Sequence, residues 1–270
     1  MGMNVANPGS AIGEAIGASM EKALKVLLTD VADQYGCHYL TLGVRKTKAG
    51  KKAKKLLMSD NFGNEYDIDG VIANESMQPL ILFESKYIRY KKHNRDKGSW
   101  VCTAHSAVRR RYHSIRSSIA ILAGSWSKSS VALMQSHDIN MFFIPFDFVC
   151  TLLANHGIQF IWGEKEKEKA FMAWKKFNEL SEKDQDQLGQ SMIQIIEDKL
   201  IQRIESILDD TIDREIEKVT LELVSNLGEL KVYEFKSVDS AIDFLKNVDL
   251  DSVFVTKKSI TLFESPPSFE

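Results

Sequence analysis

Two acidic residues and a lysine have the types and the spacing of a metal-dependent hydrolytic site. Asp69 follows one apolar run of the chain, and Glu84 and Lys86 lie in the next. In an extended strand, residues two apart share a face, so Glu84 and Lys86 point the same way while Ser85 points the other way. Carboxylates from neighbouring strands can hold a hard divalent cation, and an adjacent ammonium can orient or deprotonate a water molecule. The combination predicts metal-dependent hydrolysis of phosphodiester bonds.

A hairpin is the element that must bring these groups together. The runs Glu65–Ala73 and Pro79–Tyr90 have the composition of strands, and the five mostly polar residues between them, Asn74–Gln78, show no helical pattern. Such a connection favours two antiparallel strands. We therefore expect Asp69 and the segment Glu84–Lys86 to lie on adjacent strands.

The charge of the chain is segregated, although the formal net charge is only −2. The stretch from Arg45 to Lys128 has 18 basic and 7 acidic residues, and the remainder has 17 basic and 30 acidic residues. A basic region around a small acidic cluster is typical of an enzyme that acts on a phosphate backbone. The competing interpretation is a solvated basic face that has no polyanionic partner.

The acid and lysine pattern resembles the PD-(D/E)XK nuclease superfamily, typified by type II restriction endonucleases. Asp69, preceded by Ile68, corresponds to the Pro-Asp pair, and Glu84–Lys86 corresponds to the (D/E)xK half of the motif. Isoleucine in place of proline makes the motif less specific but keeps the acid. The resemblance covers roughly residues 10–145.

The resemblance implies a mechanism. One or two Mg²⁺ ions would be held by Asp69, Glu84 and the main-chain carbonyl of Ser85, because Mg²⁺ prefers oxygen ligands. Lys86 would position the attacking water or stabilise its hydroxide form, and would offset charge on the phosphorus.

Further acidic residues could assist this site. In such enzymes a glutamate on the first helix often contributes, and Glu21 is the candidate here, with Glu14 as the alternative. Asp67 shares a strand face with Asp69 and is an auxiliary acid, ranked ahead of Glu65.

DNA contacts are expected in two segments after the catalytic strand. Lys91–Ser99 is polar and basic and is predicted to be a loop, and Thr103–Ala123 is predicted to be a helix with a basic stripe. The alternative for the stripe is a solvent-exposed helix face. The predicted DNA-binding residues are Lys91, Lys92, Arg109, His113 and Arg116.

The remaining patterns predict an α/β fold, with a mixed central β-sheet flanked by helices and a mainly helical C-terminal extension. The first domain is expected at residues 1–163 and the extension at residues 164–270, unless the two pack as one domain. Other expected elements are helices at 10–35 and 147–154, strands at 39–44, 131–134, 140–144 and 159–162, a long or broken helix at 185–227, and a strand–helix–strand ending at 231–235, 238–245 and 252–263. The long helix could pack on the core, dimerise or recognise the target.

Two observations compete with the site assignment. Glu234–Lys236 repeats the Glu-x-Lys spacing in a strand-like segment, but no strand ending in acids precedes it. A surface hairpin with salt bridges is the structural alternative for Asp69 and Glu84. Against that alternative, Leu80–Phe83 is continuously apolar, which predicts a central strand.

Taken together with this pattern, the resemblance implies a Mg²⁺-dependent endonuclease for double-stranded DNA, acting as a homodimeric type II restriction enzyme beside a separate cognate DNA methyltransferase. The chain has no apolar run of membrane-spanning length, and its three cysteines show no pairing pattern, so a cytoplasmic protein is expected. The alternatives are a repair, junction-resolving or phage-defence nuclease of the same superfamily, and a non-catalytic DNA-binding or assembly protein.

Overall fold

The computed structural model describes residues 7–42, 56–90, 94–163, 166–250 and 252–254. The chain divides into two units, residues 1–209 and residues 210–270, which are described separately. No helix among the described residues is long and apolar enough to cross a membrane.

A five-stranded mixed sheet forms the centre of the first unit. Its order is β1-β4-β5-β6-β7; β1, β4 and β5 are antiparallel, whereas β5, β6 and β7 are parallel. This confirms the predicted α/β class with a mixed sheet. The strands are β1 (His38–Leu40), β4 (Gly70–Ala73), β5 (Pro79–Ile88), β6 (Ser117–Gly124) and β7 (Ile139–Pro145).

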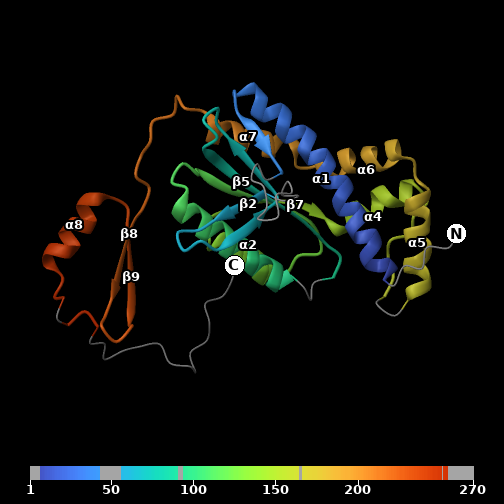
Figure 1. The fold of residues 1–270 in the computed structure, drawn as a ribbon. Helices are drawn as coiled ribbons and strands as arrows, with labels where there is room; N and C mark the ends of the chain where they lie inside the picture. Colours follow the sequence, from blue (N-terminus) through green and yellow to red (C-terminus); the bar gives the residue numbers. More distant parts are fainter. Residues whose placement is uncertain (1–6, 43–55, 91–93, 164–165, 251, 255–270) are drawn as a thin grey trace. The chain divides into compact units, whose positions relative to one another are not determined.

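Helices cover both faces of the sheet (Figure 1). One face packs its buried side chains, such as Phe83 and Ile121, against α1, with α4, α5, α6 and α7 completing the same apolar core. The other face, with Leu82 and Leu122, packs against α2 and α3. The helices are α1 (Pro8–Gln34), α2 (Asn94–Arg111), α3 (Lys128–Gln135), α4 (Phe146–Asn155), α5 (Lys167–Glu179), α6 (Glu182–Gln194) and α7 (Glu197–Leu208).

Helices α5 and α6 both pack against α1, so the helical stretch after residue 163 is continuous with the core of the first unit. The structure therefore has the mainly helical stretch that the sequence predicted towards the C-terminus.

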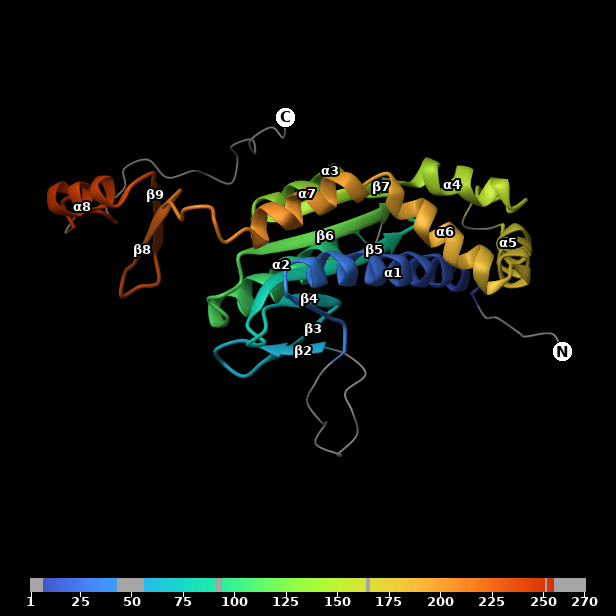
Figure 2. The same ribbon diagram turned by 90° about the horizontal axis from the view of Figure 1, so that it is seen from above.

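The predicted hairpin is present as β4 and β5, with Gly70 opposite Phe83. Its turn is closed by Asn74, whose backbone N–H donates to the Gln78 carbonyl and whose side-chain oxygen accepts from the Gln78 N–H. The run expected as one strand, Glu65–Ala73, is divided at Asp69. Before that residue, β3 (Glu65–Ile68) pairs with β2 (Leu56–Ser59) in a separate two-stranded sheet, next to β4 in Figure 2.

Helix α1 begins and ends as its sequence dictates. The Asn7 side chain accepts from the Ser10 N–H as an N-cap, and Pro8 occupies the first turn, where its missing N–H costs nothing. At the other end, Gly36 has a φ of 63°, a conformation that glycine adopts without steric cost. The predicted helix over residues 10–35 is confirmed.

The predicted helix Thr103–Ala123 is wrong. Helix α2 ends at Arg111, and the segment Ser117–Gly124 is the central strand β6. Seven consecutive residues of β6 are buried because parallel neighbours and helices cover both of its faces. In such a continuous apolar run, three- and four-residue spacings occur whatever the structure, so they do not distinguish a helix from a buried strand.

Four smaller expectations also fail. The loop predicted at 91–99 contains the start of α2 at Asn94, and the strand predicted at 131–134 lies within α3. Residues 159–162 form no strand. The helix predicted over 185–227, as one long helix or two in series broken near Asp209, fails in part: two helices in series, α6 and α7, are present and end before Asp209, but the chain after Asp209 is non-helical and then forms a strand.

The described part of the second unit, residues 210–250 and 252–254, contains a hairpin and one helix. Strands β8 (Val219–Val224) and β9 (Leu230–Phe235) are antiparallel, and Phe244 of α8 (Val238–Asn247) packs against Tyr233 and Phe235. The expected strand at 231–235 and helix at 238–245 are present. The last expected strand, 252–263, lies almost wholly outside the described residues.

Candidate active site

The structure brings Asp69, Glu84 and Lys86 together. The ammonium Nζ of Lys86 lies 2.8 Å from Asp69 Oδ2 and 2.7 Å from Glu84 Oε1. One cation therefore bridges two carboxylates that come from different segments of the hairpin. This is the juxtaposition that the sequence predicted.

Asp69 is positioned by the bend between β3 and β4. Its Oδ2 also accepts a hydrogen bond from the backbone N–H of Ser85, at 2.9 Å, which ties the bend to β5. Gly70 follows directly, and a side chain there would overlap the hydroxyl of Tyr39. The glycine thus lets Tyr39 pack against the strand beside Asp69.

Glu84 lies deepest of the three groups. It is 2% exposed, whereas the side chains of Asp69 and Lys86 are 29% and 25% exposed. A buried carboxylate on a central strand needs a charged partner to remain ionised. Lys86, reaching from the same face of β5, is that partner. Glu84 is therefore not part of an exposed surface salt bridge, which was the structural alternative for Asp69 and Glu84.

The electrostatics of the pair keep Glu84 ionised and Lys86 protonated. Burial raises the pKa of Glu84, but His105 and Lys86 lower it by more, so its pKa lies below the ordinary value. Burial lowers the pKa of Lys86, but the charges of Glu84 and Asp69 raise it well above the ordinary value. In the metal-free protein Lys86 is therefore a hydrogen-bond donor and a fixed positive charge.

Asp69 and Glu21 are perturbed in the opposite direction. Burial and the charge of Glu84 raise the pKa of Asp69 despite the contacts with Lys86 and Ser85. Desolvation and the charge of Asp69 raise the pKa of Glu21, which interacts with the Ser85 side chain. Glu21 on α1 is thus electrostatically part of the cluster, as expected for an auxiliary acid.

His105 of α2 lies against the other oxygen of Glu84. Its Nε2 is 3.8 Å from Glu84 Oε2, an ion-pair distance rather than a hydrogen bond, and the residue is 1% exposed. His105 is not among the site residues expected from the sequence. A signal was available, because His105 falls in the buried helical stripe formed by Val101, Ala104 and Val108.

The donor set suits a hard divalent cation. Asp69 and Glu84 direct oxygens at one positively charged group, and Mg²⁺ is commonly bound by one or two carboxylates, with waters and substrate phosphates completing the shell. Within the described parts of the chain, no three His, Cys, Asp or Glu side chains form a preformed metal cluster. A site at this position would therefore rely on two carboxylates, a backbone carbonyl such as that of Ser85, and water.

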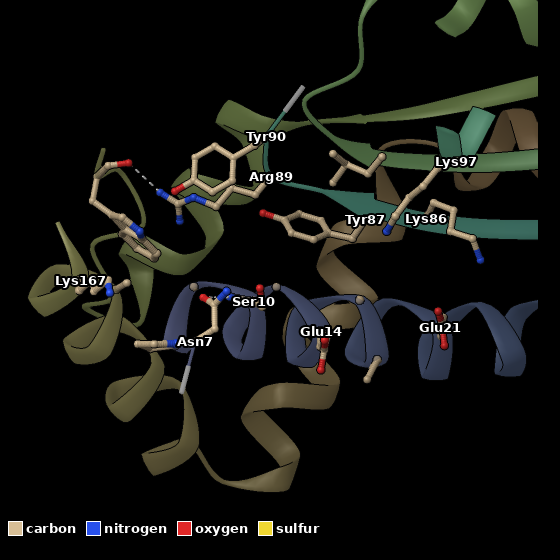
Figure 3. Close-up of a pocket in the computed structure, with 18 of the residues that line it drawn as sticks. Asn7, Ser10, Glu14, Glu21, Lys86, Tyr87, Arg89, Tyr90, Lys97 and Lys167 are labelled. Atoms are coloured by element: carbon tan, nitrogen blue, oxygen red, sulfur yellow. Dashed lines mark hydrogen bonds between the residues drawn. The ribbon is translucent and has the colours of Figure 1, made fainter. Parts of the chain in front are cut away.

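Two clefts meet at the candidate site. The first, which we call the α1–β5 cleft, has a volume of about 660 Å³ and is lined by Lys86 and by residues after it on β5 (Figure 3). The second, the α1–β3 cleft, has a volume of about 560 Å³ and is lined by Asp69 and Tyr39. Glu21 and Ser85 line both clefts. The cluster is consequently open to solvent on two sides of Glu21.

The other predicted acids lie at different distances from the cluster. Asp67 is in β3 and lines the α1–β3 cleft with Asp69, but the bend at Asp69 removes the strand geometry that was expected to place them on one face. Glu14 lines the α1–β5 cleft. Glu65 begins β3 and lines neither cleft.

The predicted DNA-binding stripe does not exist, because the helix ends at Arg111. His113 lies in the turn after α2, and Arg116 Nη1 donates to the Ile207 carbonyl at 2.8 Å, joining the turn to α7. Arg109 is half-buried in the last turn of α2. None of Arg109, His113 and Arg116 lines either cleft. Lys91 and Lys92 lie outside the described residues.

The rival motif, Glu234–Lys236, has a different environment. Glu234 is exposed in β9, opposite Thr220, and pairs with Lys218 at 3.4 Å. Lys236 is exposed after the strand ends. No buried carboxylate accompanies this segment among the described residues of the second unit.

Comparisons with known proteins give little guidance. No protein-family model and no curated protein matches the chain. Among solved structures, the crystal structure of a protein of unknown function, AF1548, is similar over 70% of this chain and 98% of that chain, with 12% identity and a TM-score of 0.31. Similarity at this level carries no argument about fold or function.

Proposed function

We propose that the chain is a Mg²⁺-dependent endonuclease that hydrolyses phosphodiester bonds in double-stranded DNA. The observation that carries the proposal is the bridge from Lys86 Nζ to Asp69 and to the buried Glu84, at the meeting point of two clefts. A surface salt bridge explains neither the burial of Glu84 nor the position of the cluster. Phosphodiester hydrolysis needs such an arrangement, with charge placed beside a water-accessible phosphate.

The residues have distinct roles in this proposal. Asp69, Glu84 and the Ser85 carbonyl would hold Mg²⁺, which supplies Lewis-acid charge and a lowered pKa for bound water. Lys86, whose pKa is raised, donates a hydrogen bond to the attacking water or to a phosphate oxygen and offsets negative charge as the bond to the leaving oxygen breaks. Glu21, at the junction of the clefts, orients water through its contact with Ser85.

The finer proposal is a type II restriction enzyme. It would act as a homodimer on a two-fold symmetric site, because isologous pairing matches the symmetry of a palindrome, and a separate methyltransferase would protect the same site.

The test is digestion of phage DNA with Mg²⁺ and with EDTA, followed by sequencing of the ends. Restriction predicts discrete fragments whose ends share one sequence, in Mg²⁺ only. Cleavage at structural features without a shared sequence would instead indicate a repair, junction-resolving or phage-defence nuclease. Stable duplex binding without metal-dependent cleavage on any DNA would contradict the enzymatic proposal and indicate a binding protein.

A further inference from the structure

The α1–β5 cleft extends from the candidate site to a second group of positive charges. Lys86 lies at one end, Lys97 of α2 follows, and Arg89 and Lys167 lie farther along, near Asn7 at the start of α1 (Figure 3). The acids of the cleft are distributed differently. Glu21 lies at the catalytic end, Glu14 is one or two turns along α1, and Glu166 at the distal end is hydrogen-bonded to Lys169 and to the Gly163 N–H.

The guanidinium of Arg89 is fixed in position, but two of its nitrogen atoms have no hydrogen-bond acceptor among the described residues. Its guanidinium carbon lies 3.4 Å from the centre of the Trp162 ring and 4.5 Å from that of Phe160, and its Nη2 donates to the Trp162 carbonyl at 3.1 Å. Its Nε and Nη1 are buried and have no hydrogen-bond partner among the described residues. Cation–π contacts fix the position of the group but leave these N–H donors unmet, and unmet buried donors cost stability. Arg89 lines the cleft, and an anion there would neutralise a guanidinium that has no carboxylate partner among the described residues.

The start of α1 adds to the positive electrostatic potential at this end of the cleft. Residues 7–10 line the distal end of the cleft, and the first turn of this 27-residue helix contains no acidic residue. A helix N-terminus carries partial positive charge and favours phosphate. Lys97 and Lys167 have no ion-pair or hydrogen-bond partner within the part of the chain that the structure describes. The helix start and Lys167 therefore reinforce the field around Arg89.

The size of the cleft limits the ligand. About 660 Å³ is the size of a small molecule or of one to two nucleotides of a strand, so the backbone of one strand can enter the cleft while the rest of a duplex stays outside it. Arg89 follows Lys86 by three residues, just after β5 ends at Ile88, so the two Cα atoms are at most about 10 Å apart. Because the backbone winds around the helix axis, neighbouring phosphates of a strand lie farther apart than the axial rise of about 3.4 Å, and this separation corresponds to about one to two nucleotides.

We propose that Arg89, Lys167 and the start of α1 bind a phosphate group of the substrate strand about one to two nucleotides from the scissile phosphate, with Lys97 contacting the backbone between them. This inference rests on the proposed function, since it takes the position of the scissile phosphate from Lys86. The phosphate comes either from an internal phosphodiester or from the terminal phosphomonoester of a strand end. Both sources present the same anionic oxygens to the guanidinium.

The test is duplex binding in EDTA, where no cleavage occurs. Lys97→Gln, Lys167→Gln and the double variant are compared with wild type by fluorescence anisotropy at several salt concentrations. Lys199→Gln is the matched control, because it removes the same charge from an exposed position on α7 that lines neither cleft. The probes are one short duplex with 5′-hydroxyl ends and the same duplex with 5′-phosphate ends.

The double variant should bind about tenfold more weakly and lower the slope of log affinity against log salt by about one to two, since each phosphate contact contributes about 0.9. Equal losses on both probes identify an internal phosphodiester, and a loss confined to the phosphorylated probe identifies a terminal one. The inference is overturned if the double variant binds both probes with the affinity of wild type, or if Lys199→Gln loses as much affinity as the double variant.

Cleavage of phage DNA in Mg²⁺ is measured separately on the same proteins. If wild type cuts but the double variant binds normally, the phosphate site is refuted and the nuclease proposal stands. If wild type never cuts but the double variant loses affinity, the phosphate site stands and the nuclease proposal fails.

Discussion

The same tripeptide spacing occurs in two strands of this molecule with opposite consequences. In β5, Glu84 is 2% exposed and shares Lys86 with Asp69. In β9, Glu234 is exposed and pairs across the hairpin with Lys218, at a position where water screens the charges. A Glu-x-Lys sequence in a strand can therefore form a reactive site only when the glutamate is buried and a third charged group lies beside it.

The difference comes from the sheets that hold the two segments. Strand β5 has neighbours on both sides, β4 and β6, and helices over both faces, so a charge on it is desolvated. Strand β9 belongs to a two-stranded hairpin whose alternate residues face solvent. A central strand thus provides the low-dielectric setting that strengthens electrostatic interactions.

The largest expected effect separates the two glutamates. Glu84→Gln should reduce Mg²⁺-dependent cleavage of phage DNA at least about a thousandfold, because it removes a proposed metal ligand. Glu234→Gln is the matched control and should cut within about twofold of wild type. The reverse order of the two variants would move the site to β9.

The two lysines sharpen the comparison. Lys86→Ala should lower the cleavage rate by about 10²–10³, the range for loss of one preorganised donor, while duplex binding in EDTA stays close to wild type. Lys236→Ala should leave the rate unchanged. Equal rates for both variants would show that Lys86 only neutralises its neighbours.

His105 tests whether the surroundings of Glu84 matter beyond its partners. His105→Gln should raise the Mn²⁺ concentration needed for half-maximal binding by about 10–100-fold, because neighbours that orient a ligating carboxylate tune its metal affinity. A merely structural role would lower the melting temperature without changing Mn²⁺ affinity, measured by electron paramagnetic resonance.

The smallest effect is on pH-dependent stability of the metal-free protein. The pKa of Glu84 is lowered on folding, so its stabilising contribution is present above the ordinary value of 4.5 and is lost as the pH falls through the lower folded value. The difference in unfolding free energy between wild type and Glu84→Gln should therefore shrink on acidification. The raised pKa of Asp69 acts with the opposite sign, and the charge of Glu84 is one of its causes, so the measured difference is the net effect of the two carboxylates.

Urea unfolding in EDTA followed by tryptophan fluorescence measures this difference, since all four tryptophans lie in residues 1–209. A Glu84→Gln difference that stays constant down to pH 4 would contradict the pairing with Lys86.

The candidate site was predictable from sequence because its parts are close along the chain. Asp69 and Glu84 are joined by one polar turn, and the apolar run before Glu84 marks a central strand. Local sequence patterns are sufficient to predict a contact that forms within one hairpin. The position of β6 could not be predicted in the same way, because its residues Ile119–Ala123 satisfy helical and strand spacing equally.

The surroundings of the site depend on contacts distant in sequence. Arg89 meets Trp162 73 residues later, and Arg116 meets Ile207 91 residues later. No periodicity in one sequence encodes such pairs, so the contact between Arg116 and α7 was not predicted, and the expected DNA contact of Arg116 stays a prediction. The start of α2 at Asn94 was likewise hidden, since its first turns are polar and basic.

Asp69 provides the most direct test, because it lies outside the tripeptide and only the fold brings it to Lys86. The measurement is the rate of DNA cleavage by Asp69→Asn in Mg²⁺, at a protein concentration where wild type digests the substrate completely. We predict that cleavage is lost while duplex binding and unfolding free energy remain close to wild type. Cleavage by Asp69→Asn at the wild-type rate would contradict the account.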